Sequence, residues 1–264
     1  MHDVFSLHET PHRHYKVVRD GALRAGWNGA GGRRIASVTQ ILGGDDSLPA
    51  WAARQAMAAC TEAVRTWYAI DPVAGLLSLG EIAQLQPEWP DNVKDKAAAE
   101  GTAAHTYFGA CLLGPMAMRR CEAPYGLRCA IDAFITVHTA ILQSDARGPL
   151  LERAVGDFDR AVAGTYDAVV DIDFRRHRID LKSSKSMRPE YWAQLAAYER
   201  CAMLCGEMPS EFLSILHIDR LGGYALHSIP TDGPEHVQAL ALFDAHLLIH
   251  RSAGPLAKLF NVKE

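Results

Sequence analysis

The spacing of hydrophobic residues changes after Gly148 in this chain of 264 residues. Before that point the pattern is mainly helical, with apolar positions spaced as on one side of a helix. It predicts helices over residues 37–42, 51–70, 93–113 and about 127–143. Three prolines in 71–92 remove hydrogen-bond donors and clash with the preceding turn, so we expect a loop with one short helix there.

From Gly148 onward, apolar and polar side chains alternate, which is the signature of strands with two different faces. The alternation predicts an antiparallel meander of three strands, over 151–158, 164–174 and 177–184. In the second strand Asp167 and Ala168 point to opposite faces, and in the third Asp180 and Lys182 share one face.

The last part of the chain combines helices and strands. Pro189 suits a first helical position and Gly206 suits a helix end, so they bound a helix over 189–205. Further on, the pattern predicts strands over 212–218 and 224–229 and a helix over 235–250. We expect that helix to bury one apolar stripe, formed by Val237, Leu240, Ala241, Leu247 and Leu248.

Together these elements predict an α/β protein with a central mixed β-sheet flanked by helices, plus a helical N-terminal lobe. The first residues lack sustained periodicity. We expect an irregular N-terminal segment over 1–34, a helical lobe over 35–147 and a core over 148–264, with lobe and core forming one compact unit.

The composition is that of an ordinary globular protein, with 48% hydrophobic and 22% charged residues. These values exclude a disordered, collagen-like or coiled-coil chain. The sequence has no run of about 18 apolar residues, and its opening residues are too polar for a secretory signal. We therefore expect no membrane partner.

Six cysteines show neither C-x-x-C pairs nor the density of a disulfide scaffold. This usage favours reduced core thiols in a cytoplasmic protein. The cysteines are Cys60, Cys111, Cys121, Cys129, Cys201 and Cys205.

The formal net charge of −4 argues against a protein coated in basic residues for indiscriminate nucleic-acid binding. The charge is uneven, however. A basic island, with Asp180 as its one acid, contains Arg175, Arg176, Arg178, Lys182, Lys185 and Arg188. It indicates a localised site for a polyanion, with a solvated protein face as the alternative.

Two carboxylates and an ammonium group converge when the predicted meander is folded. A turn near 173–176 places Asp167 opposite a residue between 180 and 185, and Asp180 and Lys182 share a face. Carboxylates that close repel each other unless a cation or hydrogen-bond donors compensate them. Oxygen ligands with open positions suit Mg²⁺ or Mn²⁺. Glu152, near the start of the neighbouring strand, is a third carboxylate for such an ion, or a surface strand residue.

This grouping is suited to the hydrolysis of phosphodiesters. Enzymes accelerate such slow reactions by about 10¹⁵-fold or more, so proximity alone is insufficient. A divalent ion polarises the phosphoryl oxygen and lowers the pKa of a bound water, and Lys182 would orient the nucleophile or stabilise the anionic transition state. Asp180-x-Lys182 is the chain's only Asp-x-Lys or Glu-x-Lys, and it falls on a predicted strand. A surface ion-pair network is the alternative.

Six sequence segments carry a resemblance to a known family. GTYDAVVD, then Asp180 in IDLKSSK thirteen residues after Asp167, then YWAQLAAYE resemble the core of the PD-(D/E)XK nuclease superfamily, in its RecB-like exonuclease branch. SVTQIL, LPAWAARQA and KDKAAAEGTAAH are similar to the helical lead-in of phage exonucleases related to the CRISPR adaptation nucleases. The likeness spans about residues 35 to 230 and implies a restriction-endonuclease-like core.

The resemblance implies roles for the residues of the metal centre. Asp167 and Asp180 would be metal-binding carboxylates, and the backbone carbonyl of Leu181 a further ligand. Lys182 would be the catalytic lysine. His105, in EGTAAH, matches the histidine that the branch adds as a metal ligand, with a satisfied core histidine as the alternative.

Further positions match the helix and loop that follow the lysine. Gln194 and Tyr198 match the branch's Q-x-x-x-Y, and Tyr191 lies on the same helical stripe, so these side chains can face the site and touch DNA. Ordinary helix packing is the alternative. The residues expected to grip phosphate, unless they form a simple exposed loop, are Ser183, Ser184, Lys185 and Arg188.

One departure from the CRISPR-associated relatives concerns cysteine. Many of those relatives hold an iron–sulfur cluster with one cysteine before the core and three grouped after it. This chain has Cys201 and Cys205 on the late helix and no trio near its C-terminus, so we predict no iron–sulfur cluster.

The sequence therefore predicts a Mg²⁺- or Mn²⁺-dependent DNA exonuclease of recombination, repair or phage DNA metabolism. Its expected partner is DNA, with a recombination or annealing protein and an oligomeric state as open alternatives. A cytoplasmic location, in a bacterial cell or a phage-infected host, is expected. Two alternatives stay open: a non-cleaving component that binds DNA ends, and a structure-specific endonuclease on the same fold.

Overall fold

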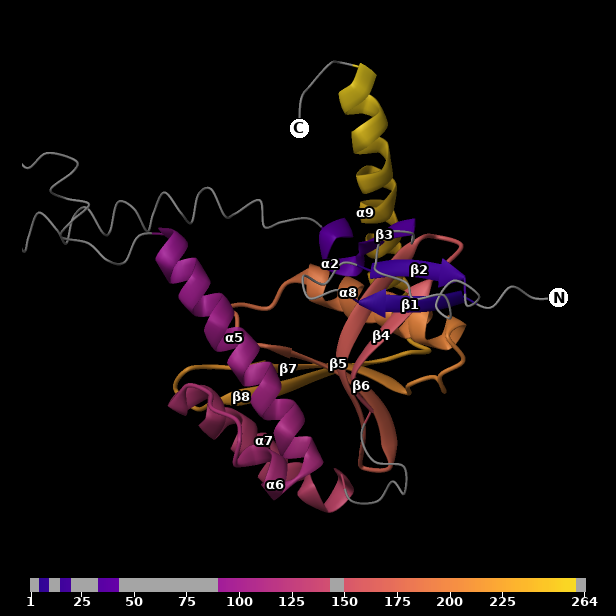
Figure 1. The fold of residues 1–264 in the computed structure, drawn as a ribbon. Helices are drawn as coiled ribbons and strands as arrows, with labels where there is room; N and C mark the ends of the chain where they lie inside the picture. Colours follow the sequence, from indigo (N-terminus) through magenta and orange to yellow (C-terminus); the bar gives the residue numbers. More distant parts are fainter. Residues whose placement is uncertain (1–4, 10–14, 20–32, 43–89, 143–149, 260–264) are drawn as a thin grey trace, which may run out of the picture. The chain divides into compact units, whose positions relative to one another are not determined.

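The computed structural model of the chain describes residues 5–9, 15–19, 33–42, 90–142 and 150–259 (Figure 1). By their internal contacts, residues 1–43 and 104–264 form one unit and residues 44–103 a second. Of the second unit, only 90–103 are described. The helix predicted over 51–70 lies outside the described residues, as does most of the loop predicted over 71–92.

A mixed sheet forms the centre of the larger unit. The chain order of its strands is β1 (Phe5–Glu9), β2 (Tyr15–Arg19), β3 (Arg33–Ser37), β4 (Leu150–Asp157), β5 (Val162–Ile172), β6 (Arg175–Lys182), β7 (Phe212–Ile218) and β8 (Tyr224–Pro230). Neighbouring strands follow the order β1-β2-β3-β5-β6-β7-β8, and β4 pairs with β5. β3 with β5 and β6 with β7 are parallel pairs, and the others are antiparallel. The predicted meander of β4, β5 and β6 and the mixed sheet are confirmed.

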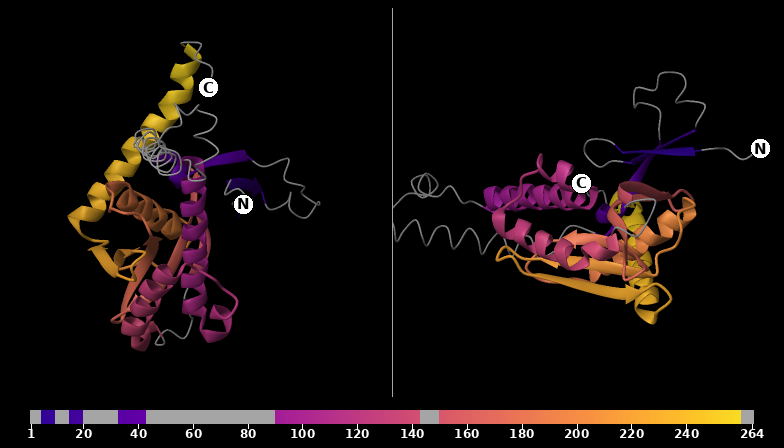
Figure 2. Two further views of the ribbon diagram at one scale, coloured as in Figure 1. Left: turned by 90° about the vertical axis from the view of Figure 1, so that its left-hand side faces the viewer. Right: turned by 90° about the horizontal axis from the view of Figure 1, so that it is seen from below.

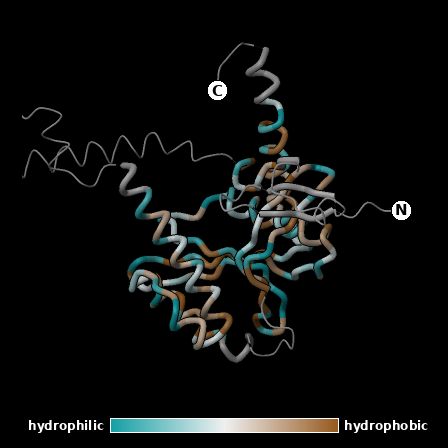
Figure 3. The backbone as a smooth tube through the Cα atoms, in the orientation of Figure 1, coloured by the Kyte–Doolittle hydropathy of each residue, from teal (hydrophilic) through white to brown (hydrophobic). Residues whose placement is uncertain are grey.

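The described helices are α2 (Val38–Ile41), α5 (Pro90–Leu113), α6 (Pro115–Met118), α7 (Tyr125–Leu142), α8 (Pro189–Leu204) and α9 (Pro234–Leu259). Apolar side chains of α2, α8 and α9 form one core with one face of the sheet. Those of α7 and of the part of α5 from Ala104 onward form another core with the opposite face (Figure 2). Hydrophobic segments accordingly recur in the central strands and in the helices packed on them (Figure 3). The predicted fold class is confirmed and is compatible with a restriction-endonuclease-like core.

The three N-terminal strands were not predicted. β1 and β2 lie in the segment expected to be irregular, and β3 begins at its end. Strands of five residues give a weak periodic signal, and their stability comes from the partners with which they pair. For β3 those partners are β2 and, more than a hundred residues later, β5, with Ala36 opposite Val162. Ser37 ends β3 and forms a capping box with Gln40 at the start of α2.

The apolar stripe predicted for the last helix is right for Leu247, which is buried, and for Leu240, which packs against the core, but wrong for Val237, Ala241 and Leu248, which are exposed. Val237 and Leu248 are 65% and 67% exposed, whereas Ala239, Phe243 and Leu247 are buried. The sequence of α9 places apolar residues around much of its circumference, so periodicity alone does not select the buried side. Contact with α8 and α2 selects it.

Free cysteines are less uniformly buried than expected. Cys111 and Cys201 are buried, Cys121 and Cys129 are half-buried, and Cys205 is exposed. The expectation of a core thiol is therefore wrong for Cys205, which follows the last turn of α8. Cys60 lies outside the described residues.

None of the described helices is both long enough and apolar enough to cross a membrane.

Candidate metal and catalytic site

Asp167 lies where β5 breaks its regular alternation. Tyr166 belongs to the core under α8, and Ala168, two positions later, belongs to the core on the opposite face of the sheet. On β4, Glu152 has a positive φ of 45°, and the ladder between β4 and β5 skips both Glu152 and Asp167. Because of this distortion, the Asp167 carboxylate does not point into either of the two apolar cores.

The hairpin of β5 and β6 brings the second carboxylate alongside the first. Asp173 and Phe174 form its two-residue turn, and both have positive φ, of 51° and 63°. The ladder runs back to the pair Ala168 and Ile179, so the next position sets Asp167 against Asp180. This register agrees with the turn and the range predicted from the sequence.

The backbone of β6 and helix α5 both contact Asp167. Its Oδ2 accepts a hydrogen bond of 2.7 Å from the N–H of Leu181 and lies 3.1 Å from Nδ1 of His105. Ligand atoms of His105, Glu152 and Asp167 all lie within 4.8 Å of one another. An imidazole and two carboxylates at this spacing fit a divalent ion. The carboxylate oxygens suit Mg²⁺ or Mn²⁺, and the imidazole nitrogen favours Mn²⁺ over Mg²⁺. These three residues could therefore hold a metal ion.

The two aspartates have opposite pKa shifts. Burial alone would raise the pKa of Asp167, but His105, the charge of Lys182 and the N–H of Leu181 together lower it. Burial, together with the negative charge of Asp167, raises the pKa of Asp180 despite the opposing effect of Lys182. The pair thus carries the electrostatic strain of two neighbouring buried carboxylates, which a bound cation would relieve.

Lys182 is held as an ammonium group between three partners. Its Nζ lies 2.6 Å from Oδ2 of Asp180, donates to Oε1 of Gln194 at 3.0 Å, and lies 5.0 Å from the ring centroid of Tyr191. Burial lowers its pKa, but the charges of Asp180 and Asp167 outweigh burial and raise it.

Helix α8 extends this chain of contacts through Gln194 and Tyr198. Gln194 Nε2 donates to the hydroxyl oxygen of Tyr198 at 2.8 Å, which completes a chain of contacts from Asp180 through Lys182 to Tyr198. Of the expected stripe, Tyr191 and Gln194 contact Lys182 directly, and Tyr198 is joined to it through Gln194.

Gly164 helps to shape the site, and it was not predicted from the sequence. A Cβ atom at this position would lie 2.2 Å from Cε1 of Tyr198, so the bare backbone of β5 is what lets the tyrosine ring pack there. A glycine inside a strand often marks such a close approach. That signal was available in the sequence, but nothing along the chain identified Tyr198 as the neighbour.

The basic island does not form one patch. Arg178 is fully buried, with Nε 2.7 Å from Oε2 of Glu199 and Nη2 3.3 Å from Oε2 of Glu207. Arg175 pairs with Glu211 at 2.6 Å. The prediction of a shared polyanion site is therefore wrong for these two arginines, because neighbouring strand residues point to different faces.

Hydrogen bonds join the loop before α8 to itself and to β7. Ser184 Oγ donates to the carbonyl of Ser186 at 3.0 Å, and the carbonyl of Ser184 accepts from His217 Nε2 at 2.6 Å. Lys185 is exposed, and Ser183 is half-buried. Arg188 occupies the N-cap position of α8. Phosphate binding by these residues, and metal binding by the carbonyl of Leu181, stay predictions.

Comparisons with known proteins give weak similarities. No protein-family model matches the sequence, and no curated protein sequence matches it. The crystal structure of SSO0001 is similar with 14% identity and a TM-score of 0.33, covering 81% of this chain and 75% of that one. An alkaline exonuclease (LHK-Exo) from Laribacter hongkongensis is similar with 15% identity and a TM-score of 0.26, covering 62% of this chain and 100% of that one. These values are too low to identify a family, so the function rests on the site.

Proposed function

We propose that this protein is a metal-dependent deoxyribonuclease that hydrolyses phosphodiester bonds, and that it acts as an exonuclease in DNA recombination, repair or phage DNA metabolism. The observation that supports this most is the cluster of Asp167, Asp180 and Lys182 on adjacent strands, with His105 and Glu152 beside it. The resemblance of the same positions to the PD-(D/E)XK motif agrees with the chemistry of the cluster.

Each residue of the cluster would have a distinct role. A Mg²⁺ or Mn²⁺ ion held by His105, Glu152 and Asp167, with Asp180 alongside, would polarise a phosphoryl oxygen and acidify a bound water. Lys182 would donate hydrogen bonds to the scissile phosphate or to the attacking water, with its charge kept by Asp180.

Gln194 and Tyr198 would act on Lys182. The Gln194 amide oxygen accepts a hydrogen bond from one of the three N–H groups of the ammonium group, which fixes the directions of the other two. Tyr198 accepts a hydrogen bond from the other end of that amide, so the amide cannot rotate without losing a contact.

The test is a time course with end-labelled linear DNA, single- and double-stranded, in Mg²⁺, Mn²⁺ or a chelator. We expect cleavage with either metal and none with the chelator. Lys182→Ala should reduce cleavage at least 100-fold, in line with the loss of a transition-state hydrogen-bond donor. Lys96→Ala, at an exposed lysine of α5, is the matched control and should retain activity. Full cleavage by folded Lys182→Ala would refute the assignment.

A covalently closed circular DNA separates the proposal from its alternatives. An exonuclease spares the circle, a structure-specific endonuclease cuts it, and a non-cleaving component that binds DNA ends cuts neither circle nor linear DNA.

A further inference from the structure

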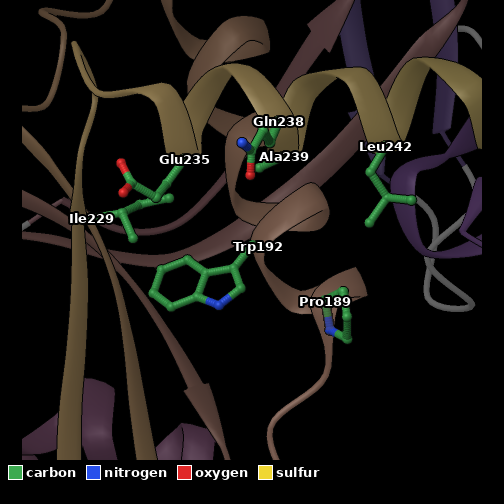
Figure 4. Close-up of a pocket in the computed structure, with 7 residues that line it drawn as sticks. All are labelled: Pro189, Trp192, Ile229, Glu235, Gln238, Ala239 and Leu242. Carbon is green, nitrogen blue, oxygen red and sulfur yellow. The ribbon is translucent and has the colours of Figure 1, made fainter.

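A groove between α8, β8 and α9 uses none of the residues of the metal and catalytic site (Figure 4). Its volume is about 370 Å³, within the range of sites for small ligands. Its walls include Pro189 and Trp192 of α8, Ile229 of β8, and Glu235, Gln238 and Leu242 of α9.

The groove lies on the same helical turn as the site. Trp192 directly follows Tyr191, whose ring centroid is 5.0 Å from Lys182 Nζ. Successive residues of a helix project about 100° apart, so Trp192 projects about 160° away from Gln194, which contacts Lys182. The site and the groove therefore lie on different sides of α8, and a strand of DNA with a phosphate at Lys182 passes around the first turn of this helix to reach the groove.

The walls have the chemistry of a platform for a planar ring. Trp192 is half-buried and presents its indole below α9, between Ile229 and Pro189 (Figure 4). Aliphatic side chains surround it, and the polar side chains are Glu235 and Gln238 on the α9 wall. Nucleobases stack on such aromatic rings, and a carboxylate accepts hydrogen bonds from their exocyclic amino groups.

The charges fit a base inside the groove and its phosphates outside. None of the lining residues is a cation, and Glu235 would repel a phosphate. Lys185 is exposed on the loop that leads into α8, four residues before the lining residue Pro189. The positive charge is thus on the loop where the sugar–phosphate backbone would pass.

We propose that this groove binds one nucleobase of the DNA substrate by stacking it on Trp192. The proposal rests on the proposed nuclease function and adds a second position at which the protein holds the DNA strand. The bound base belongs to a nucleotide near the phosphate at Lys182. Glu235 favours bases with an exocyclic amino group, so adenine, cytosine and guanine bind better than thymine.

The test measures equilibrium binding of a short single-stranded oligonucleotide in a chelator, so that no cleavage occurs. Trp192→Ala should weaken binding about 10-fold, the effect expected for the loss of one stacked base. Phe174→Ala is the matched control, because this aromatic residue is 85% exposed at the β5–β6 turn, and it should bind as wild type does. Trp192→Phe keeps an aromatic platform and should retain most of the affinity. Thermal unfolding of each variant checks the fold.

A scan with abasic nucleotides makes the test specific. An abasic nucleotide at the position whose base enters the groove should weaken binding to the wild-type protein about 10-fold. The same nucleotide should not weaken binding to Trp192→Ala any further. Thymine at that position should bind more weakly than adenine, and Glu235→Gln should reduce the difference. The proposal is overturned if folded Trp192→Ala binds as tightly as wild type, or if every abasic position affects both proteins equally.

This result is independent of cleavage. If neither metal supports hydrolysis but one abasic position couples to Trp192, the nuclease assignment fails and the base-binding groove stands. If DNA is cleaved and no position couples to Trp192, the groove proposal fails and the nuclease assignment stands.

Discussion

At the scale of single residues, the most deeply buried charge of the described chain lies outside the catalytic cluster. Arg178 is fully buried between Glu199, Glu207 and the ring of Tyr166, whose centroid is 4.1 Å from the guanidinium carbon. Arg178→Met removes the cation and leaves two buried carboxylates without it. We expect the free energy of unfolding to fall by about 3–5 kcal/mol, measured by urea denaturation.

Arg175→Met is the control for this change. Arg175 also pairs with a glutamate, Glu211, but the two side chains are 61% and 47% exposed. Exposed ion pairs contribute about 0–1 kcal/mol, so this variant should unfold close to wild type. Equal losses in both variants would contradict the role given to Arg178.

His177 predicts a dependence of stability on pH. It is buried, stacked on Phe212, and shares a hydrogen bond of 2.8 Å with Ser214 Oγ. Burial is the main cause that lowers its pKa to about 4, partly opposed by the charges of Asp173 and Glu211. The unfolded chain, with an ordinary histidine pKa of about 6.5, binds the proton more readily, so acid favours unfolding.

The stabilising effect of a neutral His177 is complete above about pH 6.5 and is lost as the pH falls toward 4. The loss is at most about 3 kcal/mol. It is measured as the difference in unfolding free energy between pH 7 and pH 4.5, in wild type and in His177→Gln. Carboxylates titrate in both proteins, so the extra loss in wild type reports His177. Identical pH dependence in both would contradict the assignment.

At the scale of elements, β5 and α8 pack closely against each other at one glycine, Gly164. Gly164→Ala would place a methyl group 2.2 Å from Cε1 of Tyr198, so the ring must move. Since Tyr198 holds Gln194 and Gln194 holds Lys182, the ammonium group loses its fixed direction. We expect the turnover number for DNA cleavage to fall about 10-fold or more, with a smaller change in KM.

Gly109→Ala is the matched control for this substitution. Gly109 lies within α5, and a Cβ there would meet no atom within 4 Å. Alanine is the better helix former by about 1 kcal/mol, so this variant should be at least as stable as wild type and fully active. A fully active, stable Gly164→Ala would show that Tyr198 has no positioning role.

Periodicity along the chain predicted the elements whose faces are set locally. The meander, α8 and the strands after it alternate or repeat clearly, and the register of the β5–β6 hairpin follows from a two-residue turn. Periodicity failed where a distant partner decides. β3 joins the core of the sheet through its parallel pairing with β5, more than a hundred residues later, and the buried side of α9 is selected by the helices against it.

The same division holds within the site. Asp180 and Lys182 could be predicted because strand side chains repeat every two residues, and Gln194 and Tyr198 because helical neighbours lie four apart. The contact of Gly164 with Tyr198 and the pairing of Arg178 with Glu199 join separate elements. Their geometry depends on how α8 lies on the sheet, which no local pattern encodes.

At the scale of the whole molecule, α5, β4 and β5 each supply one residue to the group that could hold a metal ion. An ion bound by His105, Glu152 and Asp167 joins the three elements in the folded state alone, so it must stabilise that state. At an ion concentration 100 times the dissociation constant the gain is about 2.7 kcal/mol. Mn²⁺ or Mg²⁺ should therefore raise the midpoint of thermal unfolding, and a chelator should reverse the rise.

Asp167→Asn should abolish that metal-dependent rise, since the Asp167 carboxylate lies 3.1 Å from Nδ1 of His105 and contacts the backbone of β6 as well. Glu122→Gln, at an exposed acid between α6 and α7, should leave the rise intact and controls for nonspecific binding of ions to surface carboxylates. The measurement needs no DNA, so it tests the metal centre separately from hydrolysis. An equal rise in Asp167→Asn and wild type would place the ion elsewhere and remove Asp167 from the proposed ligands.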